Sequence, residues 1–74
     1  MSAPRAVDPD LGLEVEVRIV HPYRALKPYR CPGCGHAIRP GTGHFVVVPI
    51  EAADLRRHWH RPCWERAVRV GTAQ

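Results

Sequence analysis

The sequence is poor in large apolar side chains and has no long apolar run. Its 74 residues include one phenylalanine, one methionine, two tryptophans and two tyrosines. No stretch approaches the roughly 20 apolar residues that a membrane span requires. The opening "MSAPRAVDPD" lacks the apolar segment of a signal peptide. We therefore expect one small cytoplasmic domain whose core is too small to be stable without a metal or a disulfide.

Cysteine is also scarce, and the three cysteines cannot all pair as disulfides, which argues against a secreted disulfide framework. "CPGCGH" begins with a C-x2-C pair, and "HWHRPCW" contains an H-x2-C pair after an interval of 25 residues. Two such pairs can place four nitrogen and sulfur atoms around one ion, the donor set of structural zinc. The sequence therefore predicts one zinc ion bound by four residues: Cys31, Cys34, His60 and Cys63.

His58 is the competing histidine, because on a continuous strand it would point to the same side as His60. We favour His60, whose spacing from Cys63 suits the start of a helix. His58 is then expected to form hydrogen bonds nearby or to lie on the surface. The same is expected of His21, His36 and His44. Free thiols and an iron–sulfur cluster are the alternatives to zinc, although such clusters usually use four thiolates.

The order of the expected elements predicts a small α+β domain. "LEVEVRIV", residues 13–20, alternates strictly and predicts a strand with Leu13, Val15, Val17 and Ile19 on its buried face. Residues 44–50 predict a second strand, for which "RRHWH" is the partner. A helix is expected over residues 62–70, with Pro62 in its first turn and Gly71 at its end. We expect a flexible tail over 1–12, a zinc-binding domain over 13–71 and a tail over 72–74.

The two cysteine motifs carry a resemblance to known zinc fingers. "HWHRPCW" resembles the ending of LIM-type and poly(ADP-ribose) polymerase-type fingers, in which a knuckle and β-hairpin lead to H-x2-C at a helix start. This resemblance implies a treble-clef-like fold with an extra N-terminal strand. "KPYRCPGC", "IRPG" and "RRHWHRPCW" are similar to small actinobacterial proteins that often carry an ATP/GTP-binding label. The sequence contains no G-x4-G-K-[ST] phosphate loop to support that label.

The positive charge is concentrated in the part of the chain that contains the cysteines. Residues 1–20 have a net charge of −2 and residues 21–74 a net charge of +6. Such a balance favours an anionic partner such as nucleic acid. The candidate contacts are seven arginines: Arg30, Arg39, Arg56, Arg57, Arg61, Arg66 and Arg69.

Three other functions compete with a non-catalytic nucleic-acid-binding module. One is a protein-interaction adaptor that uses the edge of strand 13–20 and an aromatic surface near Trp59. Another is an HNH-like nuclease, since "HWHRP" is similar to the H-H-x-x-P run of those enzymes. A closed zinc tetrahedron, however, leaves no open position for a catalytic water. The third alternative is that the arginines bind no ligand and only form a solvated surface.

Overall fold

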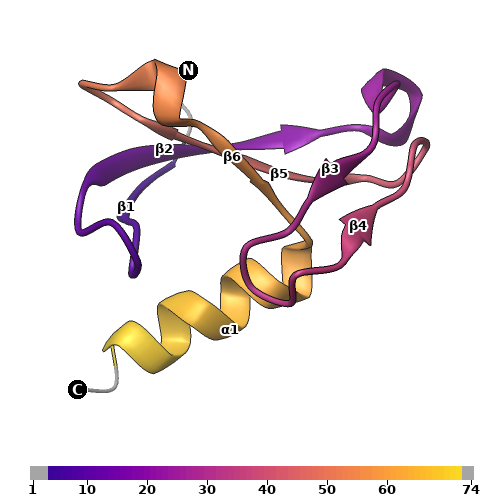
Figure 1. The fold of residues 1–74 in the computed structure, drawn as a ribbon. Coiled ribbons are helices and arrows are strands. Elements are labelled where there is room, and N and C mark those ends of the chain that lie inside the picture. The colour runs from indigo at the N-terminus through magenta and orange to yellow at the C-terminus, as the bar shows by residue number, and fades with distance from the viewer. Residues whose placement is uncertain (1–3, 73–74) are drawn as a thin grey trace.

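The computed structural model describes residues 4–72 of the chain, which form six strands, two short 3-10 turns and one helix (Figure 1). None of the described helices is both long and apolar enough to cross a membrane. In chain order the elements are β1 (Arg5–Val7), β2 (Glu14–Val20), η1 (Pro22–Arg24), β3 (Tyr29–Arg30), β4 (Ala37–Ile38), β5 (His44–Pro49), η2 (Ala53–Leu55), β6 (Arg57–Trp59) and α1 (Arg61–Thr72).

Four of the strands form an antiparallel sheet in the order β1-β2-β5-β6. β2 pairs with β5 along its length, from Val15 opposite Pro49 to Val20 opposite His44. β6 returns along β5, with Trp59 opposite Phe45. The predicted pairing of the strand over 44–50 with "RRHWH" is confirmed, and the intervening turn is η2. β3 and β4 form a separate two-stranded sheet.

β1 lies within the segment that the sequence predicted to be a flexible tail. Its residue Ala6 pairs with Val15 of β2, and the turn that follows buries Asp8 to 1% exposure. The Asp8 carboxylate accepts hydrogen bonds from the backbone N–H groups of Asp10 and Leu11, and it meets Arg57 of β6. The structure therefore differs from the prediction over residues 4–12. Residues 1–3 and 73–74 of the predicted tails lie outside the described residues.

The alternation predicted for the first long strand holds in its middle and fails at its ends. Val15 is fully buried and Val17 is partly buried against the core, but Leu13 and Ile19 are 38% and 56% exposed. The exposed Ile19 lines a groove of about 830 Å³ beside Phe45 and Trp64. Leu13 precedes the first residue of β2, Glu14.

α1 packs across one face of the sheet and places Trp64 in the core (Figure 1). The rings of Trp59 and Trp64 meet edge to face, with centroids 5.2 Å apart, and are the largest components of a core completed by Val15, Cys31, Ile38 and Val47. The helix begins one residue before the predicted start and continues through Gly71 to Thr72. The small α+β class is confirmed, with antiparallel sheets and one C-terminal helix.

Candidate metal centre

The first cysteine pair lies in the tight turn between β3 and β4. The backbone N–H of Gly35 donates to the carbonyl oxygen of Cys31 at 2.8 Å, and the N–H of Cys31 donates to the carbonyl of His36 at 3.0 Å. Gly35 has a φ of +73°, a conformation that other residues adopt at a cost. The guanidinium of Arg30 donates to the carbonyl of Gly35 at 2.7 Å. These bonds fold the turn so that Cys31 and Cys34 both face α1.

The second pair is positioned by the junction between β6 and α1. β6 ends at Trp59, and the carbonyl of His60 accepts the first helical hydrogen bond, from the N–H of Trp64 at 3.0 Å. His60 is thus the residue that precedes the helix, and Cys63 lies in the first turn. Residues three apart at a helix start lie on the same side. Pro62 fits this first turn because its missing N–H would have no helical partner.

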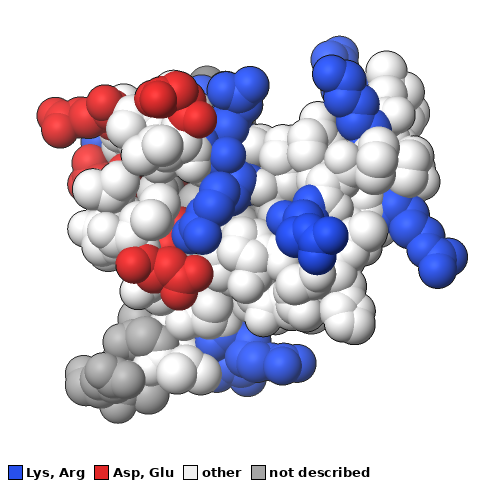
Figure 2. Space-filling view, in the orientation of Figure 1, with Lys and Arg blue, Asp and Glu red and all other residues white. Residues whose placement is uncertain are grey.

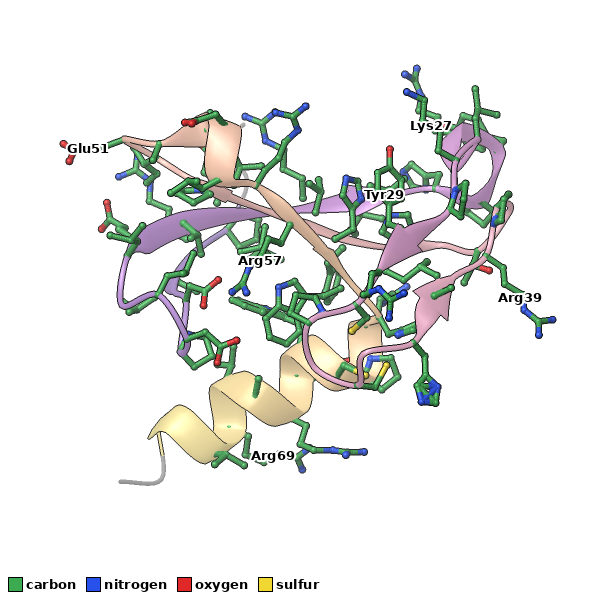
Figure 3. All side chains as sticks on the ribbon, in the orientation of Figure 1. Lys27, Tyr29, Arg39, Glu51, Arg57 and Arg69 are labelled. Carbon is green, nitrogen blue, oxygen red and sulfur yellow. The ribbon has the colours of Figure 1, made fainter. Side chains whose placement is uncertain are left out.

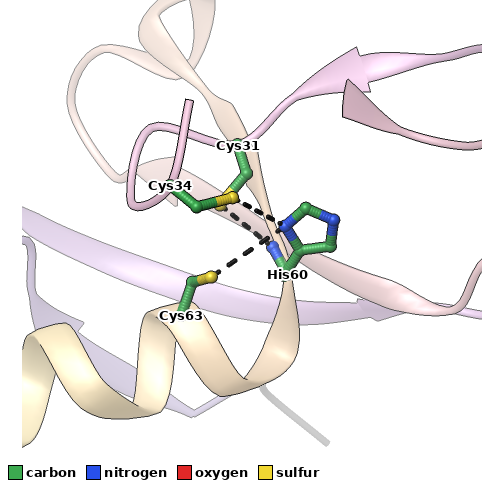
Figure 4. Close-up of side chains that lie close together, drawn as sticks. All are labelled: Cys31, Cys34, His60 and Cys63. Atoms are coloured by element: carbon green, nitrogen blue, oxygen red, sulfur yellow. Dashed lines mark hydrogen bonds between the residues drawn. The ribbon is translucent and has the colours of Figure 1, made fainter. Parts of the chain in front are cut away.

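The four predicted ligands meet at one point (Figure 4). One ligand atom from each of Cys31, Cys34, His60 and Cys63 lies within 4.8 Å of the others. Nδ1 of His60 is 3.4 Å from the sulfur of Cys34 and 3.9 Å from the sulfur of Cys63. Ligands bonded to zinc at its usual lengths would lie about 3.5–3.8 Å apart in a tetrahedron. The four residues are therefore close enough to bind a metal ion.

The electrostatics of the cluster suit a cation. Burial raises the pKa of the Cys31 thiol, but the backbone N–H groups of His60, Cys34 and Gly33 outweigh it, so the pKa falls to about 7. Burial and the two neighbouring thiols raise the pKa of Cys63 to about 11. A divalent cation placed among the sulfurs would favour the thiolate form of Cys63, which its neighbours otherwise disfavour.

The wall of the site leaves no room for a side chain at Gly33. A Cβ atom there would lie 3.0 Å from Cβ of Cys63 and 3.0 Å from Cζ3 of Trp59. The turn can therefore approach α1 and the core only because position 33 has no side chain. The signal for this contact is present in the sequence as the glycine inside C-x2-C, although its partners could not be deduced.

His58 does not join the cluster, and the continuous strand that would have put it on the same side as His60 does not form. β6 ends before His60, so the alternation of a strand does not extend to that residue. The ring of His58 instead stacks on Tyr29, with centroids 3.5 Å apart. Burial, together with nearby His44 and Arg56, lowers the pKa of His58 to about 4. The two histidines of "HWH" thus lie in different environments, His60 in the ligand cluster and His58 against Tyr29.

The remaining histidines also differ among themselves. His44 is fully buried, and it is hydrogen-bonded to the carbonyl of Thr42 and to His58. A hydrogen-bonded histidine was one of the two states expected for it, the other being a surface histidine. His21 and His36 are exposed. No local pattern indicates that His44, Tyr29 and His58 form one cluster, because these residues come from three strands.

Comparison with known proteins identifies the family. Residues 6–65 match the model of the Rv1322 family. The chain belongs to the Rv1322 family. Proteins of Mycobacterium tuberculosis strains H37Rv and CDC 1551 and of Mycobacterium bovis are each 58% identical to it over 66 residues, which covers 82% of this chain and 67% of theirs. No solved structure matches the chain.

Membership of the Rv1322 family confirms the resemblance to small actinobacterial proteins. The zinc-finger character of this family member rests on the cluster of three cysteines and one histidine. Treble-clef geometry stays a prediction.

Arg57 of the Rv1322-family chain, one of the seven predicted nucleic-acid contacts, forms an ion pair with a buried carboxylate. Its Nη2 atom lies 3.0 and 2.9 Å from the two carboxylate oxygens of Asp8, and 3.6 Å from Oδ2 of Asp10. Its guanidinium also lies over the ring of Trp59, 5.4 Å from the centroid. In Figure 3 the Arg57 side chain points from β6 toward α1, and it stays 28% exposed.

The other six predicted arginines are exposed but dispersed. Figure 3 places Arg39 and Arg69 on separate parts of the molecule, beside β4 and on α1. In Figure 2 the basic side chains form separate groups, while acidic side chains gather at the end where Glu51 lies. Arg30 is bound to the Gly35 carbonyl, and Arg61 lies over the ring of Phe45 at 5.3 Å.

Two features expected of a protein-interaction adaptor differ in the structure. β5 covers one side of the strand over 13–20, and β1 pairs with residues 14–16 on the other side, so the edge of this strand is covered in part. Trp59 offers no aromatic surface, since it is fully buried. Its position opposite Phe45, facing α1, places it in the core.

Proposed function

We propose that this Rv1322-family chain is a non-catalytic binding module whose fold is stabilised by one structural zinc ion. The observation that supports it is the convergence of four ligand atoms within 4.8 Å of one another. Three thiolates and one imidazole suit zinc, and a site closed by four protein ligands leaves no position for a substrate or water. On this proposal the turn, the strands and α1 form a treble-clef-like unit, with β1 and β2 added to it.

Metal analysis tests the zinc proposal directly. Protein purified without chelators should contain one zinc per chain, and replacement by Co²⁺ should give the absorption bands of a tetrahedral site with three thiolates. Cys31→Ser, Cys34→Ser, Cys63→Ser and His60→Ala should each lose most of the metal. His21→Ala is the matched control, because His21 is exposed and remote from the cluster in sequence. Wild-type protein that binds no zinc would refute the proposal.

We further propose that the partner is nucleic acid, contacted through the exposed arginines Arg30, Arg39, Arg56, Arg61, Arg66 and Arg69. The support is the net charge of +6 over residues 21–74 together with the exposure of these side chains. Arg66 is the sharpest position to test, because it lines a hollow that also contains Cys34 and Cys63. A nucleic-acid strand bound at this hollow would lie beside the turn that contains the cysteine ligands.

Fluorescence anisotropy with labelled DNA and RNA tests this partner. Binding should weaken linearly with the logarithm of salt concentration. Arg66→Gln should lower the slope by about one phosphate contact. Arg18→Gln is the control, because Arg18 is already paired with Glu16 at 2.7 Å within the acidic segment of residues 1–20. Absence of binding at low salt would reject nucleic acid as the partner.

A protein partner is the second candidate, favoured by the groove of about 830 Å³ beside Phe45 and Trp64. Its floor includes Val17, Ile19 and Phe45, with Arg61 at its margin. An apolar groove beside an outer strand suits a bound peptide segment. Failure of nucleic-acid binding, combined with saturable peptide binding that Ile19→Asp abolishes, would favour this function.

A further inference from the structure

Tyr29 and His58 form a direct contact between the two halves of the candidate metal site. Tyr29 is in β3, two residues before Cys31, and His58 is in β6, two residues before His60. Their rings are nearly parallel, at 8°, and their centroids are 3.5 Å apart. β3 and β6 belong to different sheets, so no strand pairing links them. The stack therefore joins the two segments immediately before the first ligand of each pair.

A chain of hydrogen bonds fixes the ring of His58 in this contact. Nδ1 of His44 lies 2.8 Å from the carbonyl oxygen of Thr42, which can only accept, so this nitrogen donates. The other ring nitrogen of His44, Nε2, is hydrogen-bonded to Nδ1 of His58 at 2.7 Å. His44 is fully buried, and the residues packed around it therefore hold the orientation of its ring. The hydrogen bond from His44 therefore also fixes the orientation in which the ring of His58 stacks on Tyr29.

The turn that carries Cys31 and Cys34 is attached to the rest of the fold by few contacts before metal binds. Its two strands pair at only two positions, Tyr29 with Ile38 and Arg30 with Ala37. A two-stranded ribbon of this kind is not stable by itself. Cys31 and Ile38 pack in the core, and the Cys31 sulfur accepts a hydrogen bond from the backbone N–H of His60 at 3.4 Å. Beside these contacts, the stack on His58 and the neighbouring ring of His44 connect Tyr29 of β3 to the main sheet.

We propose that the Tyr29–His58 stack, supported by His44, is a positioning device that sets the separation of the two ligand pairs and so increases the affinity for zinc. This inference rests on the proposed zinc site and assigns no ligand role to His58. A preformed arrangement lowers the ordering cost that metal binding must otherwise meet. The same geometry explains why "HWH" has two histidines with separate tasks: His60 binds the ion, while His58 holds the opposite segment in place.

Zinc affinity, measured by competition with a chelating dye, tests the device. Tyr29→Leu and His58→Leu remove the stack and should weaken zinc binding by about tenfold or more, the effect expected of groups that orient ligands. Tyr29→Phe keeps the ring and should bind as the wild type does. The chain offers a matched control in Tyr23, which stacks on His21 at 8° and 5.5 Å but is 73% exposed. Tyr23→Leu should leave the affinity unchanged.

The Co²⁺ spectrum separates positioning from ligation and from a purely structural role. Metal-saturated Tyr29→Leu and His58→Leu should show the wild-type tetrahedral bands and wild-type circular dichroism, because all four ligands remain. Wild-type affinity in either variant would overturn the proposal. Loss of the tetrahedral bands in His58→Leu, with their retention in His60→Ala, would also overturn it and make His58 the ligand.

A second pair of variants keeps the test decisive if the leucine variants do not fold. His58→Phe keeps a ring against Tyr29 but loses the hydrogen bond to His44, and it should bind zinc several-fold more weakly than Tyr29→Phe. Equal affinities in these two variants would overturn the proposal. Wild-type protein that binds no zinc would instead refute the metal site itself, so the two failures are distinguishable.

Discussion

The guanidinium of Arg57 contacts both carboxylate oxygens of Asp8, a residue 49 positions earlier in the chain. Asp8 is 1% exposed and the Arg57 side chain is 28% exposed. The pair connects the turn after β1 with β6, two elements that are separated in the sheet by β2 and β5. One ion pair thus spans the full width of the sheet.

Removal of the Asp8 charge should destabilise the protein considerably. Asp8→Asn keeps a side-chain oxygen for the N–H groups of Asp10 and Leu11 but leaves Arg57 without its main partner. We expect a loss of about 2–3 kcal/mol in the free energy of unfolding of the metal-loaded protein, measured in urea. Glu16→Gln is the control, because its pair with Arg18 is more exposed and should contribute less than about 1 kcal/mol. Equal effects would contradict the role given to Asp8.

Deletion of residues 1–8 should also be costly, contrary to the expectation for a flexible tail. The truncated chain loses the pairing of β1 with β2 and the partner of Arg57. It should unfold at a lower temperature than the intact chain, with the metal content unchanged. A deletion of residues 1–3 is the matched control, because it leaves β1 intact. Identical thermal unfolding of all three chains would show that β1 adds no stability.

Two glycines of the turn should resist substitution for different reasons. Gly33→Ala places a methyl group 3.0 Å from Cys63 and Trp59, an overpacking that should cost about 1–3 kcal/mol. Gly35→Ala has open space around the new methyl group but must adopt a φ of +73°, at a cost of about 1–2 kcal/mol. Chemical denaturation of the metal-loaded variants measures both. Gly33→Ala alone should also shift the near-ultraviolet circular dichroism of Trp59.

Removal of the metal should disrupt the core as well as the surface turn. Cys31 is fully buried and belongs to the same apolar cluster as Trp59 and Trp64. With EDTA we therefore expect tryptophan emission to shift to longer wavelength and the thermal transition to lose cooperativity, because metal binding and folding are coupled in small domains. Addition of excess zinc should reverse both changes. A chain that keeps its emission spectrum in EDTA would have a core independent of the metal.

The features that local sequence patterns predicted are those with local causes. The two ligand pairs follow from the spacing of cysteines and histidines, the pairing of β5 with β6 from a short interval, and α1 from Pro62 and its apolar spacing. The choice of His60 over His58 also followed from local geometry at a helix start. These elements depend on neighbours within a few residues of one another.

The features that were missed depend on contacts between distant segments. β1 has only three residues and no alternating pattern, and it is a strand because β2 offers a free edge to it. The sequence around Arg57 does not distinguish it from the other arginines, because its partner Asp8 comes from the distant turn after β1. His58 differs from His60 because Tyr29 and His44 approach it from other strands. No local pattern contains this information.

The turn that bears Cys31 and Cys34 is an excursion from a sheet whose flanking strands, β2 and β5, already pair with each other. The segment of residues 21–43 between them is therefore a long loop that strand pairing closes, and Cys31 and Cys34 connect this loop to His60 and Cys63 outside it. The entropy of closing such a loop rises only slowly with its length. The loop is also held at Ala25, which is buried and whose carbonyl accepts a hydrogen bond from the N–H of Gly41 at 2.7 Å. An insertion between Val20 and Tyr29 should therefore cost little only where it leaves this contact intact.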